Sequence, residues 1–318
     1  MLDGSKIQEL VEGIDAESIR VYAPTSMIFL CGGQVDAEKP HYLSLRSAFL
    51  RFAYDPPYEN HHIVLAEELN FVFPNDHYDN ILLLEADMAQ IADLIVLFSE
   101  SFGSVAELGA FAMINQIASN LLVFVDDKNY NADSFIKLGP ILSLEKMYGD
   151  GAVCVLTLED LSIDDIANVK NLNLNIFKAR ANAAIDIRLK ETRAHTTLNK
   201  KNEGHIIKLV VGMIQHYGAL TLSEIKMLLE CLDINHNDKR IHQFLQCALF
   251  AKWIIKDKRG LRTFYSALPV KSSIGYSFSA DARTKNRERW RSDVRTFFKN
   301  HDPDRFNSIS FALKDDQQ

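Results

Sequence analysis

Glu107 is the residue of this chain best placed to do chemistry. It follows the apolar run Leu94–Phe98, which is typical of a buried central strand, and the small residues Gly103 and Ser104, which allow a tight turn into a helix. Ligands of open α/β sheets bind beyond the carboxyl ends of the strands, and helix starts attract anions and polar groups. A carboxylate there can stabilise or trap the cation that forms when a glycosidic bond breaks.

Two interpretations of Glu107 are open at this point, because the helix dipole alone also favours an acid in a first turn. A second strand end supports the chemical one. The apolar run Met27–Leu30 continues into Cys31 and stops at the pair Gly32 and Gly33. Two such strand ends in one domain indicate a single crevice, so we expect these three residues to line the substrate site. We interpret Cys31 as a packing residue rather than a nucleophile, since no histidine is close in sequence.

The crevice lacks the signatures of several common enzyme classes. The first glycine turn does not match the dinucleotide fingerprint GxGxxG, and the chain contains no GxxxxGK[ST] phosphate loop. Histidine and cysteine do not show metal-ligand spacing, so we expect no metal and no cofactor. One clear carboxylate without a clear acid suits a leaving group that is already cationic, such as the nicotinamide of NAD. A nucleoside would need a second group to protonate the departing base.

Alternating strands and helices predict an α/β domain with a doubly wound, Rossmann-like parallel sheet over residues 1–165. The expected strands are 27–31, 62–65, 94–98, 121–125 and 153–156. The expected helices are 42–52, 79–91, 105–118 and 134–148, the last broken at Gly139-Pro140. Residues 166–202 are mostly polar, and we predict a helical connector there.

Residues 203–318 follow a different pattern, in which three helices precede a hairpin. We expect the helices at 206–216, 220–229 and 238–253, with Thr221 and Glu224 forming a capping box, and the hairpin at 253–265 with Gly260 in its turn. This order predicts an α+β winged helix-turn-helix domain that binds nucleic acid, followed by a basic tail. A winged helix used only for protein contacts is the alternative.

Charge divides the chain in the same way. Residues 1–150 hold 8 Lys and Arg against 23 Asp and Glu, whereas residues 151–318 hold 27 against 19. A basic half suits a nucleic-acid partner. The residues predicted to contact it lie on the third helix, the wing and the tail: Lys239, Arg240, Lys256, Lys258, Arg259, Arg262, Arg287, Arg289 and Arg291. For the tail, a solvated helix with a packed aromatic face is an equal alternative.

Four stretches together resemble the effector proteins of type II retrons: 29–33, 92–98, 101–111 and 134–140. Such effectors join a nucleoside 2-deoxyribosyltransferase-like domain to a C-terminal winged-helix DNA-binding domain. By this resemblance Glu107 is the nucleophile, and Glu85, where the family usually has aspartate, contacts the sugar. The resemblance also implies that Asp93, Ser101, Gly103 and Ser104 contribute to the substrate site. Ser101 replaces an aspartate of the deoxyribosyltransferase pattern, which predicts altered handling of the base.

The resemblance implies an antiphage toxin that cleaves NAD to release nicotinamide. It also implies two partners that restrain the toxin, namely a reverse transcriptase and its multicopy single-stranded DNA joined to RNA (msDNA). Two other functions are open: a nucleoside or nucleotide N-glycosidase or deoxyribosyltransferase, and a nucleotide-sensing regulator that binds DNA. The missing carboxylate at Ser101 favours the sensor, whereas the context of Glu107 favours chemistry.

Composition indicates the compartment in which the protein is expected to act. The four cysteines are widely spaced without a CxxC pair, which suits a reducing compartment, and the chain has no run of about 18 apolar residues. We therefore expect a cytoplasmic protein without a membrane segment. We also expect it to form a homo-oligomer.

Overall fold

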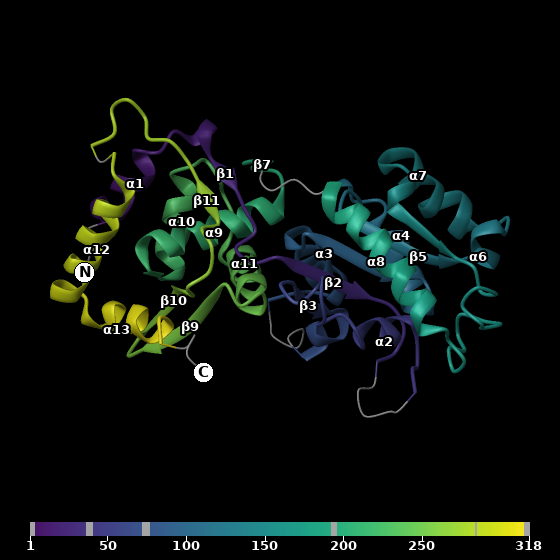
Figure 1. Ribbon diagram of the computed structural model, residues 1–318. Helices are drawn as coiled ribbons and strands as arrows, with labels where there is room; N and C mark the ends of the chain where they lie inside the picture. The colour runs from purple at the N-terminus through teal and green to yellow at the C-terminus, as the bar shows by residue number, and fades with distance from the viewer. Residues whose placement is uncertain (1–3, 36–40, 72–76, 192–195, 284, 315–318) are drawn as a thin grey trace. The chain divides into compact units, whose positions relative to one another are not determined.

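The computed structural model describes residues 4–35, 41–71, 77–191, 196–283 and 285–314 (Figure 1). Its contacts divide the chain into two compact units. The α/β unit comprises Ser26–Pro74 and Met88–Arg193, and the C-terminal unit comprises Met1–Thr25, Asn75–Asp87 and Ala194–Gln318. These boundaries differ from the predicted division, which assigned all of residues 1–165 to one domain.

The α/β unit is built on a five-stranded parallel sheet, which confirms the predicted fold class. Its strands are β2 (Met27–Cys31), β3 (His62–Leu65), β4 (Leu94–Phe98), β5 (Leu121–Asp126) and β6 (Val153–Leu156). They lie in the order β3-β2-β4-β5-β6, and each neighbouring pair is parallel. The chain reverses its direction of winding between β2 and β4. Open α/β sheets bind their ligands at such a switch point.

Short helices connect these strands. They are α2 (Leu45–Leu50), a 3-10 turn (Ala66–Phe71), α4 (Phe102–Phe111), α5 (Asn115–Ala118), α6 (Asp127–Asn131), a π-helical turn (Lys137–Ile141), α7 (Leu142–Tyr148), a 3-10 turn (Asp150–Ala152) and α8 (Leu174–Glu191). The helix α3 (Ile81–Ile91) contributes its first residues to the C-terminal unit and its last to the α/β unit.

Two of the helix predictions for this unit were wrong. The single helix expected at 105–118 is divided into α4 and α5. The expected break at Gly139-Pro140 is a π-helical turn that runs directly into α7. Proline has no backbone N–H to donate, and the wider π turn accommodates the missing bond within a helical path.

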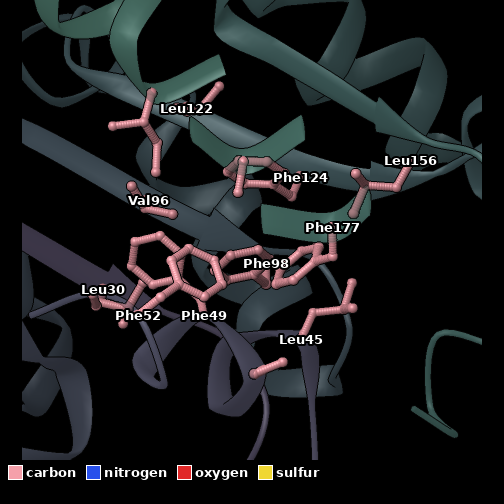
Figure 2. Close-up of a cluster of buried hydrophobic side chains, with 14 of the residues drawn as sticks. Leu30, Leu45, Phe49, Phe52, Val96, Phe98, Leu122, Phe124, Leu156 and Phe177 are labelled. Atoms are coloured by element: carbon pink, nitrogen blue, oxygen red, sulfur yellow. The ribbon is translucent and has the colours of Figure 1, made fainter. Parts of the chain in front are cut away.

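Aromatic side chains dominate the core of the α/β unit (Figure 2). The ring of Phe98 on β4 lies 4.7 Å from that of Phe124 on β5 and 6.0 Å from that of Phe177 on α8. Phe177, Ala181 and Ile185 are fully buried at helical spacing, so α8 presents an apolar stripe to the sheet. The segment predicted as a connector, 166–202, therefore holds a helix that belongs to this core.

The C-terminal unit contains the predicted winged helix-turn-helix. Its elements follow one another as α9 (Glu203–Tyr217), β8 (Ala219–Leu220), α10 (Leu222–Glu230), α11 (Asp238–Phe250), β9 (Ile254–Arg259) and β10 (Arg262–Ala267). β10 pairs antiparallel with both β8 and β9, and Gly260 occupies the turn with a φ of +57°. In this arrangement α11 occupies the position of a recognition helix and the hairpin of β9 and β10 that of a wing, and these names are used for the two elements below.

Segments from both ends of the chain complete this unit. They are α1 (Gly4–Glu12), a 3-10 turn (Ala16–Ser18), β1 (Arg20–Val21), β7 (Thr196–Thr197), β11 (Ile274–Gly275), α12 (Arg287–His301) and α13 (Pro303–Ala312). β1 pairs with both β7 and β11, which explains why the N-terminal residues group with the C-terminal ones. Within the described residues, no helix is both long and apolar enough to cross a bilayer.

Candidate active site at the switch point of the sheet

Glu100, two residues after β4, joins the ends of the two strands at the switch point. Its Oε1 accepts the N–H groups of Gly33 (2.8 Å) and Arg46 (3.1 Å), and its Oε2 accepts that of Leu45 (2.6 Å). Leu45 and Arg46 begin α2, where backbone N–H groups lack helical partners and favour a negative charge. Burial raises the pKa of Glu100, against the lowering effect of these N–H groups. Glu100 therefore holds the glycine turn and α2 against β4.

The glycine turn after β2 has no room for side chains. A Cβ atom on Gly33 would lie 2.8 Å from the Cβ of Ser44, and one on Gly32 would lie 3.0 Å from the Cβ of Arg46. Ser44 caps α2 by accepting the N–H of Ser47 at 2.9 Å, so it cannot withdraw without loss. The structure places both glycines at the carboxyl end of β2, beside the switch point, where close packing requires them, and their contact with a substrate remains a prediction.

We expect Gly33→Ala to lower the free energy of unfolding by about 1–3 kcal/mol, because the added methyl group overpacks the turn. Urea denaturation measures the change. Gly109→Ala on α4 is the matched control, since a Cβ there meets nothing within 4 Å, and it should leave stability unchanged or slightly higher. Equal stability of the two variants would show that the turn relaxes freely.

Glu107 lies in the second turn of α4, which begins at Phe102. The influence of the helix dipole is largest within the first turn, so the dipole gives a weak account of this acid. The side chain is partly buried, and its Oε2 is buried without a hydrogen-bond partner among the described residues. Burial raises the pKa of Glu107, while a hydrogen bond from the Cys31 thiol lowers it. Cys31 thus contacts the carboxylate directly, as well as packing in β2.

An ion pair between the buried Arg46 and the half-exposed Glu67 lies close enough to affect Glu107. The Nη1 atom of Arg46 donates to Oε2 of Glu67 at 2.6 Å, and its Nη2 bonds the other oxygen. Arg46 is fully buried, and its charge lowers the pKa of Glu107, whereas Glu67 raises it. Neither residue was predicted from the sequence as part of the site. The signal was a single arginine in the otherwise apolar face of the predicted helix 42–52.

Ser101 and Ser104 are brought to the predicted place, where they cap α4. The Ser101 hydroxyl accepts the N–H of Ser104 at 3.1 Å, and the Ser104 hydroxyl accepts the N–H of Ser101 at 3.0 Å. This reciprocal pair fixes the start of the helix that carries Glu107. Gly103 is exposed in the first turn. These residues position α4, and contact with a substrate remains a prediction for them.

The structure places Asp93 away from Glu100 and Glu107, and its contact with a substrate remains a prediction. Asp93 precedes β4 at the opposite edge of the sheet, where its Oδ2 accepts the Ser26 hydroxyl at 2.9 Å and the Met27 N–H at 3.2 Å. A five-residue strand separates the two edges by roughly 16 Å. Glu85 is buried on α3, in the part of that helix that groups with the C-terminal unit. Its contact with a sugar remains a prediction.

The wing offers fewer unpaired cations than the sequence indicated. Lys256 and Lys258 on β9 are exposed, whereas Arg259 pairs with Asp257 at 2.7 Å. Arg262 on β10 donates to both carboxylate oxygens of Asp302 at 2.7 and 2.9 Å. Since Asp302 caps α13, part of the predicted nucleic-acid surface instead holds the wing against the C-terminal helices.

In the recognition helix and the tail, too, most of the predicted nucleic-acid-binding cations are engaged by other side chains. On α11, Lys239 and Arg240 are bound by aspartates. On α12, Arg287 stacks on the ring of Tyr276 at 4.6 Å and Arg291 pairs with Glu288 at 3.3 Å. Arg289 lies 3.9 Å from Asp293, and its side chain is 81% exposed. The buried Trp290 and Phe298 give α12 a packed aromatic face, which favours the alternative interpretation of the tail.

Across the described ranges, no group of three or more His, Cys, Asp or Glu could hold a metal ion.

Comparison with known proteins identifies a family whose model matches most of this chain. The family model of the STM3845 retron effector protein matches residues 42–256, which is more than half of the chain. The matched range includes α2, β4, α4 and the recognition helix.

Two curated proteins of Escherichia coli match part of the chain. The chain is 34% identical over 120 residues to the "Retron Ec73 putative ribosyltransferase/DNA-binding protein", and 30% identical over 128 residues to its retron Ec86 counterpart of the same description. Each alignment covers 37% of this chain and 37% of the relative. The chain therefore aligns with well under half of the length of these relatives.

Proposed function

Because the chain belongs to the STM3845 retron effector family, we propose that it is an effector enzyme that hydrolyses the N-glycosidic bond of NAD with Glu107. The observation that carries the proposal is the Glu107 carboxylate. It lies on the helix that follows β4 at the switch point, and one of its buried oxygens has no hydrogen-bond partner among the described residues. A carboxylate oxygen that no neighbouring described group engages can face a developing positive charge on a sugar.

The neighbouring carboxylates are already engaged. Glu100 accepts three backbone N–H groups, Glu67 binds Arg46, and Asp126 at the end of β5 accepts two bonds from Asn129. None of them is set up to protonate a leaving group. This favours a substrate whose leaving group departs without protonation, as nicotinamide does from NAD.

In the proposed reaction, the bond between C1′ of the ribose and the pyridinium nitrogen breaks, and its electron pair neutralises that nitrogen. Nicotinamide leaves, and Glu107 stabilises the resulting oxocarbenium ion or forms an ester with it. Water then adds to C1′ and loses a proton, so that NAD and water give ADP-ribose, nicotinamide and H⁺. The protein supplies orientation and the negative charge, and no cofactor is consumed.

We further propose that a reverse transcriptase and its msDNA restrain this activity, with the winged helix contacting the nucleic acid. The exposed Lys256, Lys258 and Arg289 support a nucleic-acid surface in the C-terminal unit. The relatives named above carry "DNA-binding" in their descriptions, which supports the same assignment.

The direct test is nicotinamide release from NAD by the purified protein, followed by chromatography, with and without the reverse transcriptase–msDNA complex. We expect release by the protein alone and suppression of release by the complex. A panel of nucleosides and nucleotides is run in parallel. Release of free bases from the panel without release of nicotinamide would contradict the assignment of NAD.

The pH dependence should report the ionisation of Glu107. Only the carboxylate can stabilise a cation, so activity is lost as the pH falls through the raised pKa of this residue. Cys31→Ala removes a hydrogen bond that lowers this pKa, and the acid limb of the profile of kcat/KM should therefore move to higher pH. Cys154→Ala on β6 is the control, with an unchanged profile. A Cys31→Ala profile identical to wild type would exclude this contact from the working site.

Ribosyl transfer to an acceptor other than water is the second candidate, because both relatives carry "putative ribosyltransferase" in their descriptions. The same Glu107 would serve, with a different nucleophile attacking C1′ in the second step. Mass spectrometry of the products distinguishes the two. Free ADP-ribose indicates hydrolysis, and an adduct of ADP-ribose with an added nucleophile indicates transfer.

A further inference from the structure

The basic start of the recognition helix is occupied by an acidic segment of the same unit, residues 77–87. Lys239 on α11 binds Oδ1 of Asp79 at 2.6 Å. Arg240 donates to both oxygens of Asp87, at 2.6 and 2.9 Å, and lies 3.4 Å from Glu203. These are the two cations of α11 predicted to contact nucleic acid.

The contact between the segment and α11 extends beyond charge. The Tyr78 hydroxyl donates to Asp87 at 2.8 Å and lies 3.2 Å from the carbonyl of Gln243 on α11. The Gln243 side chain donates in return to the carbonyl of His77 at 2.6 Å. The rings of His77 and His242 stack at 4.6 Å. Tyr78 and Asp87 are both buried, so the segment is packed onto the helix.

We propose that residues 77–87 and DNA compete for the first two turns of α11, so that the winged helix binds DNA fully only when this segment has left the helix. The proposal rests on the proposed nucleic-acid function of the winged helix. The first residues of a recognition helix contact base edges and phosphates, and a cation bound by aspartate cannot also neutralise a phosphate. A packed segment at that position also excludes the duplex sterically.

The chemistry of the segment identifies the partner as a polyanion. Asp79 and Asp87 place two carboxylates where DNA phosphates would lie, next to the same two cations. A groove beside this surface lies between α10, α11 and the wing, and its lining includes Lys256, His242 and Arg262. A duplex seated along that groove reaches the first turns of α11 only if the carboxylates are removed.

The test is a comparison of variants in two backgrounds, read by fluorescence anisotropy with a labelled DNA duplex of two helical turns. The released variant, Asp79→Asn with Asp87→Asn, should bind about tenfold or more tightly than wild type. Adding Lys239→Ala and Arg240→Ala should remove this gain. The same two alanines in the wild-type background should change the Kd by less than about twofold, because these cations are already occupied.

The matched control is Asp160→Asn with Asp186→Asn, which removes the same charge from two exposed ion pairs of the α/β unit without touching α11 or the predicted nucleic-acid surface. If the control tightens binding as much as the released variant does, general electrostatics explains the gain and the competition is overturned. An equal loss from the alanines in both backgrounds overturns the competition and leaves DNA binding intact. Failure of the released variant to bind at all overturns both the competition and the DNA-binding part of the proposed function.

A second measurement covers the case in which the buried Asp87→Asn change destabilises the protein. Hydrogen–deuterium exchange is recorded on the unaltered protein with and without saturating DNA. Amides in 77–87 should exchange faster when DNA is bound, while those of α9 should not. Protection of the segment that is unchanged or increased by DNA would overturn the proposal.

Discussion

Glu107→Gln should lower the rate of nicotinamide release about a thousandfold or more and leave the protein folded. The amide keeps the shape of the side chain but carries no charge, so it neither stabilises the oxocarbenium ion nor forms an ester with it. Stability should be unchanged or slightly higher, because burial already disfavours the charged form of this carboxyl group and raises its pKa. Product chromatography and thermal unfolding measure the two effects.

The matched control for this change is Glu145→Gln on α7, where the carboxylate pairs with Lys137 away from the switch point. Activity of the control should stay within about twofold of wild type, as expected for a partly exposed ion pair. Activity of Glu107→Gln within tenfold of wild type would remove Glu107 from the chemistry. The crevice would then be better described as a nucleotide sensor.

Glu100→Gln should have the opposite effect, because it should strongly lower the stability of the protein. Activity should fall only because less of the protein is folded. Its carboxylate accepts three backbone N–H groups, and the amide that replaces one oxygen turns an acceptor into a donor facing a donor. Each buried N–H left without a partner costs about 1–3 kcal/mol, so we expect a loss of about 3 kcal/mol in the free energy of unfolding. Urea denaturation checks this value.

The two variants together separate chemistry from positioning. Glu100→Gln protein that retains wild-type stability but releases no nicotinamide would assign Glu100 a direct part in the reaction. Loss of stability in Glu107→Gln, with none in Glu100→Gln, would reverse both assignments. Each result is read from the same pair of assays, so neither depends on knowing the natural trigger of the protein.

The positions of the strands were predictable because buried parallel strands are written as short, continuous apolar runs. All five expected strands coincide with these apolar runs, and the two strands of the wing hairpin are joined at Gly260, as predicted. The strand ends at the switch point could also be predicted, since Gly32 and Gly33 mark one end and Gly103 lies just beyond the other. These are local signals, carried by residues that are adjacent in sequence.

The missing parts of the site depend on contacts between residues far apart in the chain. Glu100 reads as one more acid in a turn until its three N–H partners, which lie more than 50 residues earlier, are known. The pairing of Arg46 with Glu67 is likewise a contact between residues from different elements of the chain. The position of Asp93 was hard to predict for a related reason, because a residue that precedes a strand and one that follows it are close in sequence but lie at opposite edges of the sheet.

The interleaving of the two units in the chain has a consequence for how such genes can recombine. The C-terminal unit is assembled from three separate stretches, since β1 pairs with β7 and β11, and residues 77–87 pack on α11. A single crossover near residue 194 would therefore combine a foreign winged helix with a β1 and an acidic segment selected for another partner. Exchange of nucleic-acid specificity between relatives therefore requires all three stretches to be exchanged at once. Otherwise the two stretches that are not exchanged must acquire compensating substitutions.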